Sequence, residues 1–257
     1  MSRSLGPLRW VAPAISVGVL AAWEIAARHR LVSALFFPAP STIGAKLVEL
    51  AESGELERHV AATLARMLVA LVLGGGAGLL LGLALGTSAR LRAVIDPFIA
   101  ALHPVPKLAL LPLILVIFGL GFFSKALAVA VSAFFPMVIN TMTGVLQIDP
   151  TYYDVARLHG AGRGRIFWRV VLPASLPMTL AGARMAANRA LGATIALELV
   201  TAQAGLGSML FFAWQTYRTE ELYATIFVIA VFGYLFRLTV NAAAARLVRW
   251  QPESRAN

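Results

Sequence analysis

Long apolar segments alternate with short polar ones along almost the whole chain. A helix needs about 20 mostly apolar residues to cross the hydrocarbon core of a bilayer. The pattern therefore predicts an all-α integral membrane protein with six transmembrane helices. The spacing places these helices over residues 10–27, 64–87, 97–118, 126–147, 176–200 and 222–245.

Composition agrees with the bilayer as solvent. The chain of 257 residues is 59% hydrophobic and 13% charged, with a mean hydropathy of +0.78. A soluble domain of this length needs more polar surface to cover its core. The first apolar segment is similar to a signal peptide, but no clear A-x-A cleavage site follows it, so we expect a retained first span.

Basic residues are distributed unequally between alternate connecting segments. By the positive-inside rule, the segments richer in Lys and Arg are cytoplasmic, which puts both termini in the cytoplasm. The net charge of +10 then reflects topology, and we expect no nucleic-acid partner. The richer set comprises residues 1–9, 88–96, 148–175 and 246–257, and the poorer set comprises 28–63, 119–125 and 201–221.

The sequence lacks the residues that several kinds of functional site require. The chain has no cysteine, and its four histidines are scattered, so we expect no metal site. No catalytic cluster supports a membrane-integral enzyme, and no internal repeat supports a secondary carrier. The stretch LGGGAGLLLG lacks the Lys-Ser/Thr of a phosphate-binding loop. Its glycines predict close helix packing instead: Gly74, Gly75, Gly76, Gly78 and Gly82.

The third apolar segment carries Lys107 among three prolines, Pro104, Pro106 and Pro112. Helix breaks free backbone groups that must be satisfied in protein or water, so such segments often line cavities. His103 and Lys107 are therefore candidate pathway residues. The alternative is a shorter crossing over 108–123, with Lys107 reaching an interface.

The fifth segment carries further intramembrane polar residues, which usually face an interior or a water-filled cavity. At about 100° per residue, Asn188 lies about 40° from Arg184 and Glu198 about −40°, whereas Arg189 lies about 140° away. Arg184, Asn188 and Glu198 are therefore candidate pathway residues on one face. The alternative for Arg184 is a structural role, through an ion pair with an acid or capped carbonyls near the cytoplasmic end. For Glu198, near the outer end, it is a structural or gating role.

The longest cytoplasmic segment reads DVARLHGAGRGRIFWRVVLP over residues 154–173. A cap at Asp149 or Thr151 begins a short amphipathic helix that ends at Gly160–Gly162. A second helix follows, and Pro173 and Pro177 are expected to turn the chain back into the bilayer. Such a knob presents Tyr152, Tyr153, Leu158 and His159 to a groove on another protein. An interfacial loop held by arginines on anionic lipid is the alternative.

This segment resembles the signature of binding-protein-dependent ABC transporter permeases, E-A-A, three residues, G, nine residues, I-x-L-P. Asp154-Val155-Ala156 occupies the place of E-A-A, Gly160 follows at the right spacing, and Val170-Val171-Leu172-Pro173 follows after nine more residues. Asp for Glu, Val for Ala and Val for Ile are mild departures. The stretches FPAPSTI, LHPVPKLALLPLILVIFGLGFFSK and ELVTAQAGLGSML are similar to the nitrate, sulfonate and taurine branch.

The resemblance implies a type I ABC importer permease in a bacterial inner membrane, with no cofactor of its own. It implies a pair of cytoplasmic ATPase subunits that hold ATP and Mg, a second permease chain forming a homodimer, and a periplasmic or lipid-anchored solute-binding protein. A small organic or inorganic anion is the expected solute, and a pyrimidine vitamin precursor is the alternative. The residues implied to contact the ATPase are Tyr152, Tyr153, Asp154, Ala156, Leu158, His159, Gly160, Ala161 and Gly162.

The stretch TAQAGLGSMLFFAWQTYRTEELY follows the fifth segment. Gln203, Gly205 and Gly207 predict a re-entrant turn before an interfacial helix, and the resemblance implies an outer gate there. In the outer loop, residues 40–54 predict a helix capped by Ser41 or Thr42. We expect an N-terminal region 1–63, a core permease domain 64–245 that includes the coupling loop 148–175, and a cytoplasmic tail 246–257.

Overall fold

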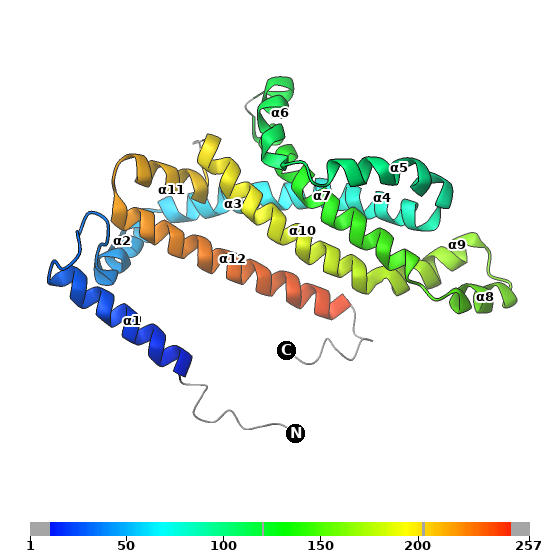
Figure 1. Ribbon diagram of the computed structural model, residues 1–257, viewed down its shortest axis with the longest axis horizontal. Helices are drawn as coiled ribbons and strands as arrows, with labels where there is room; N and C mark the ends of the chain where they lie inside the picture. The colour runs from blue at the N-terminus through cyan, green and yellow to red at the C-terminus, as the bar shows by residue number, and fades with distance from the viewer. Residues whose placement is uncertain (1–10, 120, 202–203, 248–257) are drawn as a thin grey trace.

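The computed structural model describes residues 11–119, 121–201 and 204–247, apart from the side chain of residue 12. Over these residues the chain is all-α and contains no strand, as predicted (Figure 1). The helices are α1 (Val11–Arg28), α2 (Pro40–Glu52), α3 (Glu55–Ala70), α4 (Gly76–Thr87), α5 (Ala89–Leu102), α6 (Leu111–Phe118), α7 (Phe122–Leu146), α8 (Pro150–Leu158), α9 (Arg163–Ile166), α10 (Leu172–Thr201), α11 (Leu206–Gln215) and α12 (Thr219–Leu247).

Among the described residues, four helices are long and apolar enough to cross a membrane, and a bent pair raises the number to five. The four are Glu55–Thr87, Phe122–Leu146, Arg163–Thr201 and Thr219–Leu247. α1 covers the first predicted segment with 18 residues. A total of six spans stays a prediction.

The second predicted span is part of a longer helix. α3 continues into α4 through one π-helical turn, Leu71–Gly75, so the helix begins at Glu55 rather than at residue 64. Its first turns are polar, yet His59, Thr63 and Arg66 are buried against other helices. The predicted boundary between residues 63 and 64 falls inside this helix, and the domain division stays a prediction.

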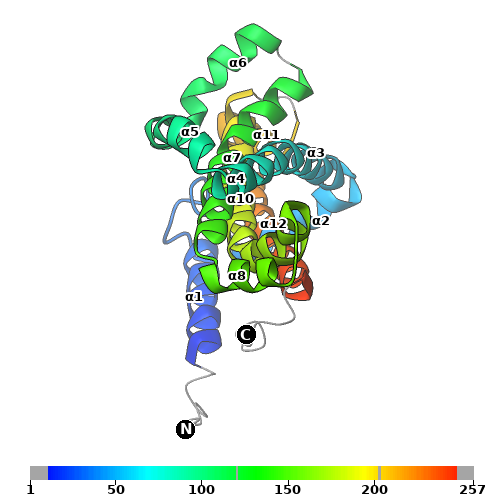
Figure 2. The same cartoon turned by 90° about the vertical axis from the view of Figure 1, so that its right-hand side faces the viewer.

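The third predicted span is broken near its prolines, as the sequence predicts. α5 begins earlier than expected, at Ala89, where the Ser88 hydroxyl accepts a hydrogen bond of 3.3 Å from the amide of Leu91. A bend of 93° then separates α5 from the 3₁₀ turn Lys107–Leu110 and α6. α6 has 8 residues, about 12 Å of helix, and ends before Gly119, so a straight crossing over 108–123 does not form. It stands away from the other helices in both views (Figures 1 and 2).

α7 lies at the centre of the bundle, and small residues allow α4 to approach it closely. A Cβ atom added at Gly74 would lie 2.0 Å from the Ala130 carbonyl oxygen, and one added at Gly78 would lie 2.7 Å from that of Phe134. Gly82 is equally constrained, whereas Gly75 and Gly76 have open space. Three of the five glycines predicted to permit helix packing therefore do so, since close backbone approach favours small residues in lipid.

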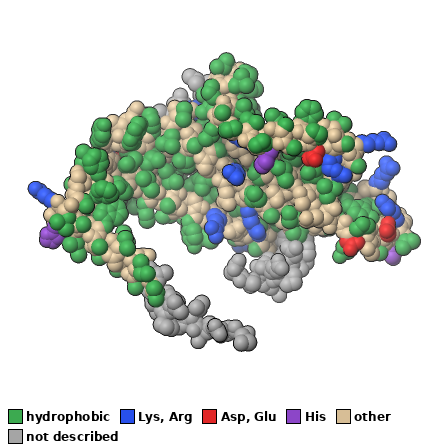
Figure 3. Space-filling model, viewed as in Figure 1, with side chains coloured by type: hydrophobic (Ala, Val, Ile, Leu, Met, Phe, Trp, Pro, Cys, Tyr) green, Lys and Arg blue, Asp and Glu red, His purple; other side chains and the backbone are tan. Residues whose placement is uncertain are grey.

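The two ends of the molecule differ in character. α8 and α9 protrude at one end, while α2, α11 and the start of α3 lie at the other (Figure 1). The first residues of α1 and the last of α12 both point toward the α8–α9 end. In the same view, hydrophobic side chains cover much of the surface, while Lys and Arg side chains lie at the α8–α9 end beside acidic ones and also near the middle of the molecule (Figure 3). The orientation of the chain in the membrane stays a prediction, and the terminal residues lie outside the described ranges.

Candidate functional site

A cleft of about 550 Å³ opens beside the broken third segment. The break supplies one wall, α7 supplies a second and the middle of α10 supplies a third. None of the described residues that line the cleft is acidic, and two of them are basic, Lys107 and Arg189. Three of the predicted pathway residues therefore meet in one place: His103, Lys107 and Asn188.

Lys107 holds the break together. Its ammonium donates to the carbonyl oxygens of Leu102 at 3.1 Å and Val105 at 2.7 Å, and also to that of His103. The same ammonium lies 4.5 Å from the centroid of the Phe135 ring. An ammonium has three donors, and these carbonyls accept from all of them. Lys107 therefore caps the freed carbonyls at the end of α5, and Arg189 is the cation of the cleft with its side chain exposed.

The face of α10 that borders the cleft differs from the predicted one. Arg184, Asn188, Arg189 and Gly192 are exposed, whereas Glu198 is fully buried. On the helical wheel the exposed sector runs from about 0° at Arg184 to about 140° at Arg189. The three residues therefore do not share one open face: Arg189 belongs to the exposed sector, whereas Glu198 is buried in an ion pair, as its structural alternative expected. The angular prediction centred the face on Arg184, which lies at one edge of the exposed sector.

The predicted knob is formed by α8 and α9, which precede α10 in the chain. The Asp149 carboxylate accepts a 2.8 Å hydrogen bond from the Thr151 amide and caps α8. Hydrogen bonds from the hydroxyl and the amide of Thr151 lower the pKa of this carboxyl. α8 ends at Leu158, and Gly160, two residues later, has a left-handed φ of +71°. The Gly160 amide donates to Arg157 and the Ala161 amide donates to Ala156, which is a Schellman closure.

The knob exposes some of its predicted contact residues and uses others for support. Tyr152 is 63% exposed and Leu158 is 85% exposed, and His159 is also exposed. Tyr153 is half-buried and packs on Val145, Val171 and neighbouring residues, which raises the pKa of its phenol. The other predicted contact residues follow the helix: Asp154, Gly160 and Gly162 are exposed, and Ala156 and Ala161 are partly buried.

The chain does not turn back into the bundle at the prolines. α9 runs without interruption through the π-helical turn Phe167–Val171 into α10, and together they form one helix of 39 residues. Pro173 lies two residues after the π-helical turn, in the interior of this continuous helix, and Pro177 lies about one turn further on. Each proline removes one backbone hydrogen bond from the helix, but neither ends it. The reversal is made by the glycine turn at residues 160–162 instead.

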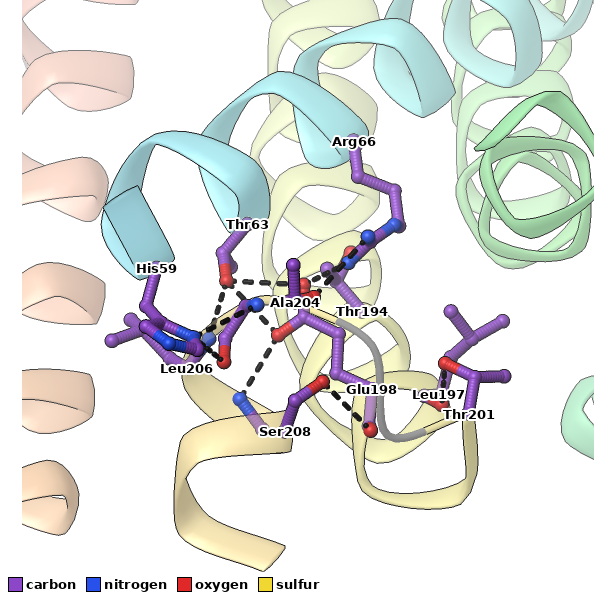
Figure 4. Close-up of polar contacts among 12 residues, drawn as sticks. His59, Thr63, Arg66, Thr194, Leu197, Glu198, Thr201, Ala204, Leu206 and Ser208 are labelled. Atoms are coloured by element: carbon purple, nitrogen blue, oxygen red, sulfur yellow. Dashed lines mark hydrogen bonds and ion pairs between the residues drawn. The ribbon is translucent and has the colours of Figure 1, made fainter. Parts of the chain in front are cut away.

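The turn before α11, where the sequence predicts an outer gate, is held by a buried polar network. We call it the outer clamp after that prediction, and it comprises His59, Thr63, Arg66, Glu198 and the segment 204–208. Glu198 forms an ion pair with Arg66, and its carboxylate accepts from the Thr63 hydroxyl at 2.9 and 3.0 Å (Figure 4). It also accepts from the Gly207 amide at 2.9 Å. Glu198 therefore joins α3 to the turn that precedes α11.

The predicted gate residues have different places in this network. His59 Nδ1 lies 3.1 Å from the amide nitrogen and 2.8 Å from the carbonyl oxygen of Gly205, so either ring tautomer has a partner. Gly205 and Gly207 both contact Glu198 closely, and Gln203 lies outside the described residues. Sequence reasoning missed His59, Thr63 and Arg66. One signal was available in the sequence: Arg66 is a lone arginine near the start of the second apolar segment, and it could have been matched with the intramembrane Glu198.

Comparison with known proteins identifies the family. A family model described as "Binding-protein-dependent transport system inner membrane component" matches residues 74–251. The taurine transport system permease protein TauC of Escherichia coli (strain K12) is 34% identical over 248 residues, 93% of this chain and 90% of the relative. The putative aliphatic sulfonates transport permease protein SsuC of Bacillus subtilis (strain 168) is 34% identical, covering 91% of this chain and 84% of the relative.

A solved structure agrees with this result. A chain of the inward-facing MetNI methionine ABC transporter superposes with a TM-score of 0.66 at 20% identity, over 74% of this chain and 94% of that one. The fold is therefore that of a type I ABC permease. The chain belongs to the family of binding-protein-dependent transport system inner membrane components and is the permease subunit of an ABC importer.

Proposed function

We propose that this permease imports a small organic sulfonate, such as taurine, through a pathway that includes the cleft between the helix break, α7 and α10. The observation that carries the proposal is the character of the cleft, which has two basic residues and no acidic one among its described lining residues. A sulfonate accepts hydrogen bonds in the fork geometry that a guanidinium offers. The names of the relatives above support the same class of solute.

Arg189 is the residue proposed to contact the sulfonate, and Asn188 offers an amide beside it. Lys107 contributes positive charge, but its donors already bond backbone carbonyls. Arg184 lies about one turn further along the same exposed sector, toward the cytoplasmic end. A neutral pyrimidine would not require the basic lining, so we rank that solute second.

The proposed assembly follows from the family. Two cytoplasmic ATPase subunits would hold ATP and Mg and contact the exposed side of the knob, where Leu158 and Tyr152 protrude. A second copy of this chain would complete the pathway, and a binding protein would deliver the solute from outside. Both chain ends would lie in the cytoplasm of a bacterial inner membrane.

The test is transport by the complete importer in proteoliposomes, with Arg189→Gln compared against Arg189→Lys. Because a hydrogen bond to a charged group contributes about 1.5–3 kcal/mol, we expect Arg189→Gln to slow taurine uptake about tenfold or more, with partial recovery in the lysine variant. Arg237→Gln is the matched control, an exposed arginine on α12 that does not line the cleft.

Two results would contradict the proposal. Normal taurine uptake by Arg189→Gln would show that the cleft does not bind the sulfonate through Arg189 during transport. If loaded binding protein stimulated ATP hydrolysis with nitrate or a pyrimidine but with no sulfonate, the solute class would be wrong while the importer function remained.

A further inference from the structure

The start of α11 lacks a cap of its own. The residue before the helix is Gly205, which has no side chain to accept from the first-turn amides. These amides bond to other helices instead. The Leu206 amide donates to the Thr63 hydroxyl at 2.9 Å, and the Gly207 amide donates to the Glu198 carboxylate at 2.9 Å. Because unsatisfied amides are costly away from water, α11 depends on α3 and α10 for its position.

The residues that cap α11 are buried and mutually paired. Thr63 and Glu198 are fully buried, and Arg66 is 4% exposed. Arg66 also donates to the Ala204 carbonyl at 3.3 Å, and the Ser208 hydroxyl donates to the Glu198 backbone carbonyl at 3.2 Å. The turn is therefore bonded on both sides of Gly205, by α3 and by α10 (Figure 4).

Two glycines let the Glu198 carboxylate reach this position. Gly205 has a φ of +124°, and a Cβ atom there would lie 2.2 Å from the Glu198 carboxyl carbon. A Cβ atom at Gly207 would lie 2.4 Å from the Ile195 carbonyl oxygen and 2.7 Å from Glu198 Cβ. Only glycine permits both the backbone conformation at residue 205 and the close approach of α10 to the turn.

We propose that Glu198 is a positioning residue of the transport cycle. With Thr63 it caps α11 from two other helices, and through its ion pair with Arg66 it makes the outer ends of α3, α10 and α11 move as one unit. α11 lies at the end opposite α8 and α9 and exposes Phe212, Trp214 and Gln215. α10 also carries Asn188 and Arg189 at the cleft. The family resemblance implies that this region contacts the loaded binding protein, and the clamp would transmit such a contact along α10 to the cleft. The role in transport rests on the importer function, whereas the capping does not.

The test compares two threonine-to-valine changes that remove the same hydroxyl from fully buried positions. Thr63→Val removes the partner of both Glu198 and the Leu206 amide. Thr194→Val removes only a bond of 2.8 Å to the Ala190 carbonyl within α10 and is the control. The chain has no cysteine, so a spin label on Gln215→Cys reports the mobility of α11, and one on Leu158→Cys reports the knob.

We expect Thr63→Val and Glu198→Gln to increase the mobility of the label at residue 215 and to leave the label at 158 unchanged. In unlabelled Thr63→Val, the concentration of loaded binding protein that half-maximally stimulates ATP hydrolysis should rise about 5-fold or more, as expected for the loss of two hydrogen bonds, with basal hydrolysis unchanged. Glu198→Gln also leaves the Arg66 guanidinium buried without its carboxylate, so its rise should be larger. Thr194→Val should match the parent in both measurements.

An unchanged label at 215 in both Thr63→Val and Glu198→Gln would overturn the capping role. A mobile label at 215 with normal stimulation would overturn the role in transmission. Mobility rising equally at residues 215 and 158 would show general loosening and would also contradict the proposal. If the parent complex gave no stimulation at all, the importer assignment would fail, whereas the label measurements would still test the capping.

Discussion

Two glycine turns reverse the chain at opposite ends of the molecule, and they are held in opposite ways. The turn at Gly160 is closed by backbone hydrogen bonds to residues within α8, and the surrounding side chains are exposed. The turn at Gly205 is closed by side chains of α3, more than 130 residues earlier in the chain, and of α10. The first turn is therefore a local structure, and the second exists only in the assembled bundle.

The ion pairs of the two regions show the same contrast. Arg157 and Asp154 on the knob are 3.3 Å apart, and each side chain is 67% exposed. Arg66 and Glu198 in the outer clamp are 5% and 0% exposed. An exposed pair contributes little because water screens it, whereas removing one member of a buried pair leaves a charge without compensation. We therefore expect mutations to separate the two regions by magnitude.

The largest effect is expected for Arg66→Leu, which leaves the Glu198 carboxylate buried without its arginine. We expect the free energy of unfolding to fall by about 3–5 kcal/mol. The matched change on the knob, Arg157→Leu, should cost at most about 1 kcal/mol. Thermal and denaturant unfolding of the purified protein in detergent would measure both.

A double variant sharpens this test. Arg66→Leu combined with Glu198→Gln removes both charges and keeps an amide oxygen to accept from Gly207. It should therefore be less destabilised than Arg66→Leu alone. Equal losses for Arg66→Leu and Arg157→Leu would contradict the distinction between the buried and exposed pairs.

An intermediate effect is expected for Gly160→Ala, because an L-residue in the left-handed region costs about 1–2 kcal/mol. Since the turn is local, this cost should appear as faster amide hydrogen exchange at the end of α8, with little change in the overall unfolding temperature. Gly162→Ala is the control, since its φ is −73° and a Cβ atom there meets nothing within 4 Å. Identical exchange rates in the two variants would show that the backbone conformation at residue 160 is not constrained.

The smallest effect concerns the cap of α8. The folded-state pKa of Asp149 is lowered, so its carboxylate stabilises α8 above the pKa of the unfolded state, about 4, and this stabilisation is lost as pH falls through the folded-state pKa. Hydrogen exchange of the first amides of α8 should therefore accelerate in acid. Asp149→Asn keeps a capping oxygen and should remove the pH dependence, whereas an unchanged acid response in that variant would assign the effect to another group.

Periodicity and local chemistry were sufficient for much of the fold. The lengths of the apolar segments predicted the helices. The Asp149 cap and the glycines after Leu158 predicted the knob. The prolines gave the broken third segment, and the spaced glycines gave the close contact of α4 with α7. Each of these depends on residues within a few positions of one another, or on the general need of a helix to satisfy its backbone in lipid.

Contacts between distant helices decided the rest. The sequence placed Glu198 with Arg184 and Asn188, because an isolated helix wheel does not show which sector its neighbours cover. The packing of α3 and α11 buries Glu198, and the opposite sector, with Arg189, borders the cleft. The sequence by itself thus determined the all-α membrane class, the apolar helices and the glycine turn of the knob, since these depend on local hydrophobicity and backbone geometry. Only the tertiary structure decided which intramembrane charges pair and which face the cleft, because a buried charge is tolerated only where another helix supplies its partner.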